Sequence, residues 1–148
     1  MVLVGREEDA EEELRAQARA AGLEDEIVFA GEVDDEDLGN WYEESDVFAL
    51  FSQYEAFGLV YFEAMLVGLP VLTHEVGANR ELLTQGARVV PRFDKEAAVS
   101  ELVRLVNDEE HRRQLSEEAQ EYALKEFTWS VVADKYLAVY RGDEAGGS

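Results

Sequence analysis

The chain has 148 residues, which is enough for one domain with a hydrophobic core. Hydrophobic residues make up 47% and charged residues 32%, the balance of a folded globular protein. The 34 acidic residues outnumber the 13 basic ones, so the formal net charge is −21. This excess argues against DNA or RNA as a direct partner, because phosphate backbones are bound by Lys and Arg. The chain has no cysteine, which excludes disulfides, thiolate metal sites and thiol nucleophiles.

Short apolar runs alternate along the chain with longer amphipathic stretches. Nearly continuous apolar runs are typical of buried parallel strands, and they occur at residues 2–4, 27–30, 47–51, 71–73 and 87–90. The amphipathic stretches between them predict helices at residues 8–21, 34–44, 57–67 and 79–84. After Pro91 the strands stop, and residues 94–106, 109–126 and 129–140 predict three consecutive helices. Thr128 is placed to N-cap the last of these helices.

This alternation predicts an α/β fold, a doubly wound, Rossmann-like parallel sheet of about five strands with C-terminal helices. Residues 1–141 are expected to form one domain, and residues 142–148 a disordered tail. Folds of this class bind ligands beyond the carboxyl ends of their strands. The loops after Gly31, Phe51 and Thr73 are therefore the expected places for chemistry.

The acidic residues are spread over the chain instead of forming one block. This spread favours the solvated acidic surface of a halophilic protein, in which salt screens the repulsion, over an acidic tail that binds a basic partner. No apolar run reaches the roughly 18 residues of a membrane span, and Met1 is not followed by a signal sequence. The expected location is cytoplasmic, including a peripheral position at the inner face of the membrane.

The stretch at residues 52–65 leaves a predicted strand, turns through a loop with Glu55 and enters a helix near Gly58. Glu63 is the only charged residue between Phe57 and Leu69, so its carboxylate either meets ligand hydroxyls or lies on a solvent-facing stripe. Glu55 is likewise either a ligand-facing acid or a plain loop acid. Gly58 either lets a diphosphate approach free N–H groups at a helix start or is an ordinary turn glycine.

In their order and spacing, residues 46–52 (DVFALFS), 55–59 (EAFGL) and 63–65 (EAM) resemble the E-x7-E signature of retaining GT-B glycosyltransferases of family 4, or group 1. The resemblance continues through residues 28–33 (VFAGEV), 68–71 (GLPV), 77–82 (GANREL) and 127–129 (FTW). It covers residues 1 to about 140. Several ordered motifs with matching spacing make it specific.

The resemblance implies the C-terminal half of a GT-B enzyme, a nucleotide-sugar donor-binding domain. Such an enzyme transfers a hexosyl group from an NDP-sugar, such as a UDP- or GDP-hexose, to an acceptor with retention, and it needs no cofactor or essential metal. By this resemblance the catalytic residue is Glu55, which lies by the donor hexose and positions it or stabilises developing charge. Glu63 holds the ribose hydroxyls.

The resemblance implies further donor-binding residues around these two carboxylates. Backbone N–H groups face the donor sugar and diphosphate from Phe57, Gly58 and Leu59. Gly31 and Val33 border the nucleobase, while the turn at Gly77 and Ala78 lies across the pocket.

The sequence departs from the family pattern in four ways. Ala56 and Ala78 stand where glycine is usual, and Arg80 stands where proline is frequent. The family's donor domain begins with a strand–helix unit that bears a Gly-Arg and a diphosphate-binding Lys. Residues 2–6 (VLVGR) mimic that unit, but the residues after them match the family's second unit. The first unit and the N-terminal acceptor domain are therefore expected to be missing, and the chain alone to be inactive.

Two alternatives stay open. One is a catalytically silent fragment that only binds nucleotide sugar. The other is a non-enzymatic α/β module such as a receiver-like signalling domain, which the absence of any lysine before Lys95 disfavours.

The remaining polar and aromatic candidates are weak. His74 either touches the donor or is a loop histidine without a role, and His111 is expected at the surface. Residues 34–37 (DDED) indicate a helix N-terminus instead of a metal loop. The aromatic residues expected to serve in packing are Trp41, Tyr42, Trp129, Tyr136 and Tyr140.

Overall fold

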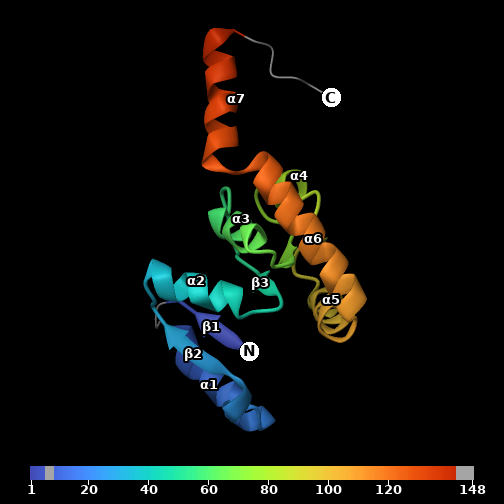
Figure 1. Ribbon diagram of the computed structural model, residues 1–148. Coiled ribbons are helices and arrows are strands. Elements are labelled where there is room, and N and C mark those ends of the chain that lie inside the picture. The colour runs from blue at the N-terminus through green and yellow to red at the C-terminus, as the bar shows by residue number, and fades with distance from the viewer. Residues whose placement is uncertain (6–8, 143–148) are drawn as a thin grey trace. The chain divides into compact units, whose positions relative to one another are not determined.

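The computed structural model describes residues 1–5 and 9–142, with the backbone alone described at residues 9 and 10. The chain divides into two compact units, Met1–Glu44 and Ser45–Ser148, and each is described by itself. Figure 1 shows the elements coloured from blue at the N-terminus to red at the C-terminus. From residue 143 on, the expected tail lies outside the described residues.

The first unit holds two parallel strands and their helices. Strand β1 pairs with β2 in the register Val2↔Val28 and Leu3↔Phe29. The elements are β1 (Val2–Val4), α1 (Asp9–Ala21), the 3-10 helix η1 (Glu24–Glu26), β2 (Val28–Gly31) and α2 (Asp35–Glu43). Asp34 caps α2, because its Oδ1 accepts from the N–H of Asp37 at 2.9 Å. The predicted helix start at residues 34–37 is therefore confirmed, whereas η1 was not predicted.

Few side chains of the first unit are buried. Among its described residues, the buried hydrophobic side chains are those of Ala18 and Tyr42. Leu14, Leu23 and Val28 are each more than 40% exposed. The first unit therefore carries apolar surface that its own described elements do not cover.

The second unit is built on three parallel strands in the order β3-β4-β5. Its elements are β3 (Phe48–Leu50), α3 (Leu59–Leu66), β4 (Val71–His74), α4 (Asn79–Leu82), β5 (Ala87–Val90), α5 (Lys95–Asn107), α6 (Glu109–Glu126) and α7 (Trp129–Arg141). The register is Phe48↔Val71 between β3 and β4 and Thr73↔Val89 between β4 and β5. Parallel strands joined through helices give the α/β architecture that the sequence predicts.

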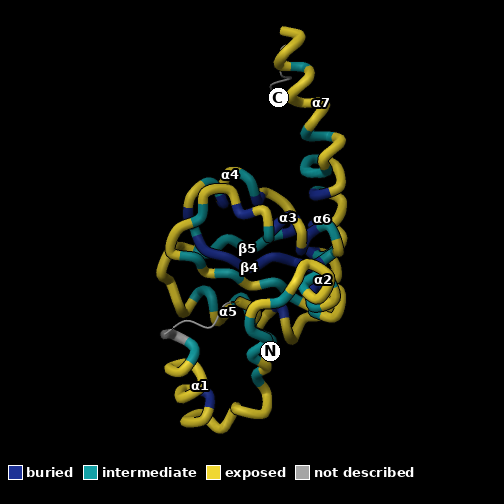
Figure 2. The backbone as a smooth tube through the Cα atoms, turned by 90° about the vertical axis from the view of Figure 1, so that its left-hand side faces the viewer, coloured by how far each residue is buried: buried dark blue, intermediate teal, exposed yellow. Residues whose placement is uncertain are grey.

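Strand β4 forms the centre of the second unit. All four of its residues are buried, and Figure 2 shows it in dark blue. Successive side chains of a strand point to opposite faces. Leu72 accordingly packs with Leu105 of α5 and Leu115 of α6, while Thr73 contacts Tyr61 of α3 through the two hydroxyl oxygens. The strand is thereby covered by helices on both faces.

Helix α6 holds the ends of two shorter helices in place. The last carbonyl groups of a helix lack intrahelical partners. Gln120 Nε2 donates to the Leu66 carbonyl at the end of α3 at 3.1 Å, and Tyr122 Oη donates to the Leu82 carbonyl of α4 at 2.7 Å. Ser116 Oγ donates to the Gly68 carbonyl just beyond α3. These contacts fix α3 and α4 against a long helix.

Helix α7 extends away from the rest of the second unit (Figures 1 and 2). Its N-cap is Thr128, whose Oγ1 accepts from the Val131 N–H at 3.4 Å, as predicted. At the corner with α6, Lys135 Nζ donates to Glu126 Oε2 at 2.7 Å, and this bond and the ammonium charge lower the pKa of Glu126. The packing role expected for three aromatic residues of α7 is wrong. Trp129 is 83% exposed, and Tyr136 and Tyr140 are exposed too, because no described element covers that face.

The Rossmann-like fold class is confirmed. In the described residues all five predicted strands and all seven predicted helices occur, with ends that differ by up to two residues. The strands form one sheet of two and one of three instead of a single sheet. Helix α3 begins at Leu59, two residues later than predicted, because Gly58 adopts a φ of 75° outside the helix. No helix in the described ranges combines the length and hydropathy needed to cross a bilayer.

Candidate functional site

Helix α3 starts after Gly58 without a side-chain cap. This residue is the N-cap in a left-handed conformation, and no side chain caps the helix. A Cβ at Gly58 would lie 2.3 Å from Cδ2 of Tyr61, so a side chain has no room here. The first N–H groups of a helix have no intrahelical acceptor and carry partial positive charge. The backbone at Gly58 and Leu59 can therefore receive an anionic group.

Gly77 brings a second turn against the loop that carries Glu55. A Cβ at Gly77 would lie 2.0 Å from the Glu55 carbonyl oxygen, and the residue has a φ of 54°. The structure thus brings together Glu55, Gly58 and Gly77 from segments that are up to 22 residues apart in sequence. Ala78 has an ordinary φ of −93°. Phe93 is the one non-glycine residue with positive φ in the described ranges, so Ala56 also needs no glycine.

The two signature carboxylates differ in exposure. Glu55 is half-buried, whereas Glu63 is exposed on α3. Leu59 and Val67 are exposed on the same stripe as Glu63, while Tyr61 and its neighbours at 62, 64 and 65 are buried. Glu63 therefore carries no desolvation cost. Neither carboxylate has a hydrogen-bond or ion-pair partner within the described part of the chain, so both can accept from a ligand.

The other predicted donor-binding residues lie in different surroundings. Phe57 is exposed at one edge, but its ring packs against Phe62 with the centroids 5.5 Å apart. Gly31 ends β2 with a φ of 71°, and its carbonyl accepts from the N–H of Gly5 at 2.9 Å. Val33 lines a cavity of about 330 Å³ in the first unit with Asp37, Asn40 and Trp41 among its walls. Gly31 and Val33 belong to the first unit and the other predicted residues to the second.

A cavity of about 480 Å³ lies beside the carboxyl ends of β3, β4 and β5. It is lined by Phe51, Gln53, His74, Val90, Phe93, Asp94, Lys95, Ala98, Val99 and Leu102. Phe93 belongs to none of the predicted motifs; it has a φ of 63°, and its ring centroid lies 5.8 Å from that of His74. Nothing in the sequence marks a left-handed phenylalanine, because this conformation is rare for aromatic residues.

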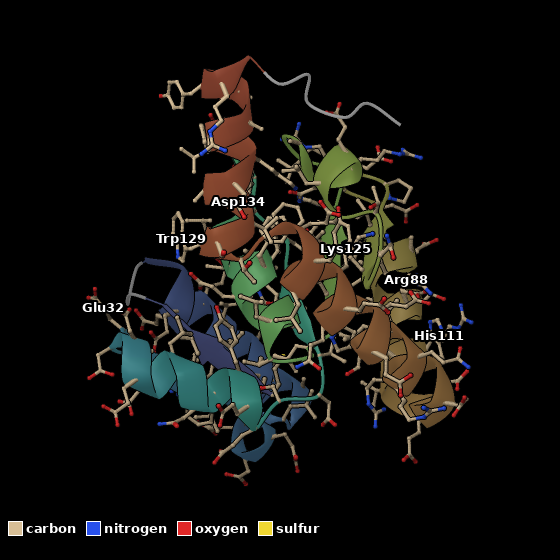
Figure 3. All side chains as sticks on the ribbon, turned by 45° about the horizontal axis from the view of Figure 1, so that its top comes forward. Glu32, Arg88, His111, Lys125, Trp129 and Asp134 are labelled. Carbon is tan, nitrogen blue, oxygen red and sulfur yellow. The ribbon has the colours of Figure 1, made fainter. Side chains whose placement is uncertain are left out.

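Both histidines differ from expectation. His74 is the last residue of β4 and not a loop residue, it is 5% exposed, and its Nε2 lies 2.7 Å from the Ser52 carbonyl. It holds the β3 and β4 ends together. The side chain of His111 is 11% exposed and not at the surface, with Nε2 3.6 Å from Glu101 Oε1. Arg88 contacts the same oxygen at 3.2 Å, so this cluster joins β5, α5 and α6, with Arg88 and His111 labelled in Figure 3.

Comparison with known proteins places these features in a family. The family model described as "Glycosyl transferases group 1" matches residues 1–122. The phosphatidyl-myo-inositol mannosyltransferase of Mycobacterium leprae is 36% identical over 152 residues, covering 100% of this chain and 39% of the relative. The chain spans 29–39% of the length of three curated relatives.

Solved structures show the same fold. HepE of Anabaena, in complex with UDP-glucose, aligns with a TM-score of 0.76 and 26% identity over 95% of this chain and 40% of HepE. The C-terminal domain of the group 1 glycosyl transferase LpcC of Francisella tularensis aligns with a TM-score of 0.75 and 24% identity, over 82% of this chain and 64% of that one. The fold of the chain is that of GT-B glycosyltransferases, and the range that the family model matches, residues 1–122, contains Glu55 and Glu63. The chain belongs to the group 1 glycosyltransferases.

Proposed function

We propose that this chain is the nucleotide-sugar-binding part of a retaining glycosyltransferase that transfers a hexosyl group from an NDP-sugar to an acceptor. The observation that carries the proposal is the convergence of Glu55, the uncapped α3 N-terminus at Gly58 and the turn at Gly77. The complex of HepE with UDP-glucose supports a nucleotide sugar as the ligand. A UDP- or GDP-hexose is the donor class that we propose.

Each site residue has a role in this proposal that suits its chemistry. The exposed Glu63 carboxylate accepts hydrogen bonds from the ribose hydroxyls, because an ionised carboxylate only accepts. Glu55 lies by the hexose. The N–H groups of residues 57–59 face the hexose and diphosphate. Gly31 and Val33 are assigned to the nucleobase, and the Gly77–Ala78 turn lies across the pocket.

The proposed reaction replaces one bond at the anomeric carbon of the hexose. The bond to the diphosphate oxygen breaks, a bond to the acceptor hydroxyl oxygen forms on the same face, and the hydroxyl proton leaves with the diphosphate. Retention keeps the leaving diphosphate close to the attacking hydroxyl. Backbone N–H groups aimed at developing negative charge stabilise such a transition state. No metal or cofactor enters this proposal.

We also propose that the active enzyme contains a further strand–helix unit and an acceptor-binding domain. Among the described residues, β1, β2, β3 and β5 each have a hydrogen-bonded strand neighbour on one side only. Val99, Val103 and Val106 on α5 are exposed, as are Leu14, Leu23 and Val28 of the first unit. An added strand and helix would cover surface of this kind. The short span of the chain relative to its relatives supports the same proposal.

A second candidate is a nucleotide-sugar-binding fragment without catalytic activity. That same short span favours it, because transfer also requires an acceptor site. This candidate and the enzyme share one donor site. A binding experiment therefore tests both.

Chemical-shift titration of the chain with UDP and with UDP-glucose tests the donor site. We expect Glu63→Ala to weaken binding of both ligands by about 1.5–3 kcal/mol, the range for hydrogen bonds to charged groups. Glu55→Ala should scarcely change UDP binding and should weaken UDP-glucose binding, because its proposed contact is with the hexose. Glu118→Ala, which removes an exposed acid from α6, is the matched control for charge. Equal losses from the two site variants, or no loss from either, would refute the assigned roles.

A further inference from the structure

A buried polar cluster lies directly beneath the candidate site. It consists of Tyr61 from α3, Thr73 from β4 and Asn79 from α4, each at most 1% exposed. The Tyr61 and Thr73 hydroxyl oxygens lie 3.2 Å apart. Asn79 Nδ2 donates to Tyr61 Oη, to Thr73 Oγ1 and to the His74 carbonyl, each at 3.3 Å. The three side chains therefore form one connected network that joins three elements.

The network constrains the geometry of those elements strongly. A buried hydroxyl or amide group is costly unless it is hydrogen-bonded, so each member depends on the other two staying in place. The two amide hydrogens of Asn79 are shared among three acceptors. Displacing α3 or α4 from β4 would leave at least one buried polar atom without a partner. Such an arrangement favours a single relative position of the three elements.

Both ends of the network support the backbone around Glu55. At one end the Tyr61 ring lies against Gly58, where an added Cβ would come within 2.3 Å of it and within 3.2 Å of Glu55 Cγ. At the other end Asn79 follows the turn at Gly77, which lies against the Glu55 carbonyl oxygen. The two glycines leave no space for a side chain between the network and the loop. The position of Glu55 is thus fixed by Gly58 with the Tyr61 ring and by the turn at Gly77.

We infer that Tyr61, Thr73 and Asn79 are positioning residues that hold the Glu55 loop and the Gly77 turn in the arrangement that takes the hexose of the donor. This inference rests on the proposed donor-binding function. The three residues do not touch the ligand in it. They act through Gly58, Gly77 and the backbone of Glu55, so their loss affects the sugar part of the donor more than the nucleotide part.

Thr73→Val tests the inference, because it removes the hydroxyl and keeps the shape of the side chain. We expect amide hydrogen exchange to rise about tenfold at Tyr61 and Asn79, whose N–H groups close turns onto the Gly58 and Val76 carbonyls. The amide of Phe127, bonded to the Ala123 carbonyl at the end of α6, is the internal reference. In titrations, the ratio of the UDP-glucose Kd to the UDP Kd should rise several-fold. Tyr61→Phe, which keeps the ring on Gly58, should act in the same direction.

Two controls separate positioning from general destabilisation. Thr73→Ser retains the hydroxyl and should restore both the exchange rates and the Kd ratio. Leu105→Val weakens the core on the opposite face of β4 and should leave the Kd ratio unchanged. If Thr73→Val raises exchange equally at all amides and leaves the ratio unaltered, the inference is wrong. If the wild-type chain binds neither UDP nor UDP-glucose while the exchange effect stays local, the donor-binding proposal fails and the loop-fixing role of the network stands.

Discussion

The close approach of Gly77 to the Glu55 carbonyl oxygen leaves no room for a side chain at position 77. We expect Gly77→Ala to lower the free energy of unfolding by about 2–4 kcal/mol, because it combines left-handed backbone strain with overpacking. Urea denaturation measures the loss. Gly142→Ala is the matched control, since Gly142 has a φ of 76° with nothing within 4 Å of an added Cβ. That variant should lose only the strain, and an equal loss from both would contradict the close packing at Gly77.

At the residue scale, the sequence predicts a site residue best where a segment offers only one residue of the required type. Glu63 stands alone among apolar neighbours and Gly58 stands at a strand–helix turn, so both are visible in the pattern. The contact of Gly77 with Glu55, and the polar cluster of Tyr61, Thr73 and Asn79, depend on how β4 places its neighbours. The spacing of these residues in the sequence does not predict either contact. In the sequence Asn79 stands at the start of the helix predicted at residues 79–84, where asparagine is common, and nothing marks it as part of a buried network.

Among the elements, α6 stabilises two other helices, because its polar side chains donate hydrogen bonds to the carbonyl groups at the ends of α3 and α4. Tyr122→Phe removes one hydrogen bond, to the Leu82 carbonyl at the end of α4, and leaves the ring in place. We expect this change to lower the free energy of unfolding by about 1 kcal/mol. Tyr136→Phe on the exposed face of α7 should lower it by nothing measurable. Chemical denaturation of both variants measures the two free energies of unfolding. Equal values would show that the hydrogen bond from α6 contributes no stability.

Element types are predictable from the sequence because apolar runs and amphipathic stretches have different periods. The ends are less so: α4 stops at Leu82, two residues before its predicted end, and η1 forms between α1 and β2 in a stretch with no helical signal. The uncovered face of α7 was unforeseeable for another reason. Aromatic residues such as Tyr136 and Tyr140 ordinarily indicate packing. The residue pattern of a helix does not show whether another element covers its apolar face.

Across the whole molecule, repulsion between acidic side chains governs how stability responds to salt. With a net charge of −21 we expect the melting temperature to rise as KCl is increased toward about 1 M, because salt screens repulsion between exposed acids. Circular dichroism melts across the series provide the measurement. The double variant Glu118→Gln/Glu121→Gln removes two of the 34 acidic residues, and its melting temperature should respond less steeply to salt. A melting temperature independent of salt would instead favour a basic partner for the acidic surface.

Whether sugar transfer occurs also depends on which binding surfaces the whole chain contains. We expect the 148-residue chain to bind nucleotide sugar at roughly millimolar Kd and to show no measurable transfer. Helix-end N–H groups stabilise an anion by only about 0.3–2 kcal/mol, and orientation of an acceptor, worth up to about 7–11 kcal/mol, needs a second binding surface. A radiolabelled-sugar transfer assay on the purified chain measures this. Robust turnover would show that donor and acceptor sites are both present here.

The exposure of Trp129 has a consequence for spectroscopy. The chain has two tryptophans, Trp41 in the first unit and Trp129 at the start of α7. An indole that is 83% exposed already emits at the wavelength of the unfolded chain, so Trp129 is nearly silent when the second unit melts. A shift in intrinsic fluorescence therefore reports Trp41 and the first unit alone. Near-ultraviolet dichroism adds the buried Tyr61 and Phe62 of the second unit to the contribution of Trp41 and Tyr42, so a melting curve that differs between the two signals reports the second unit.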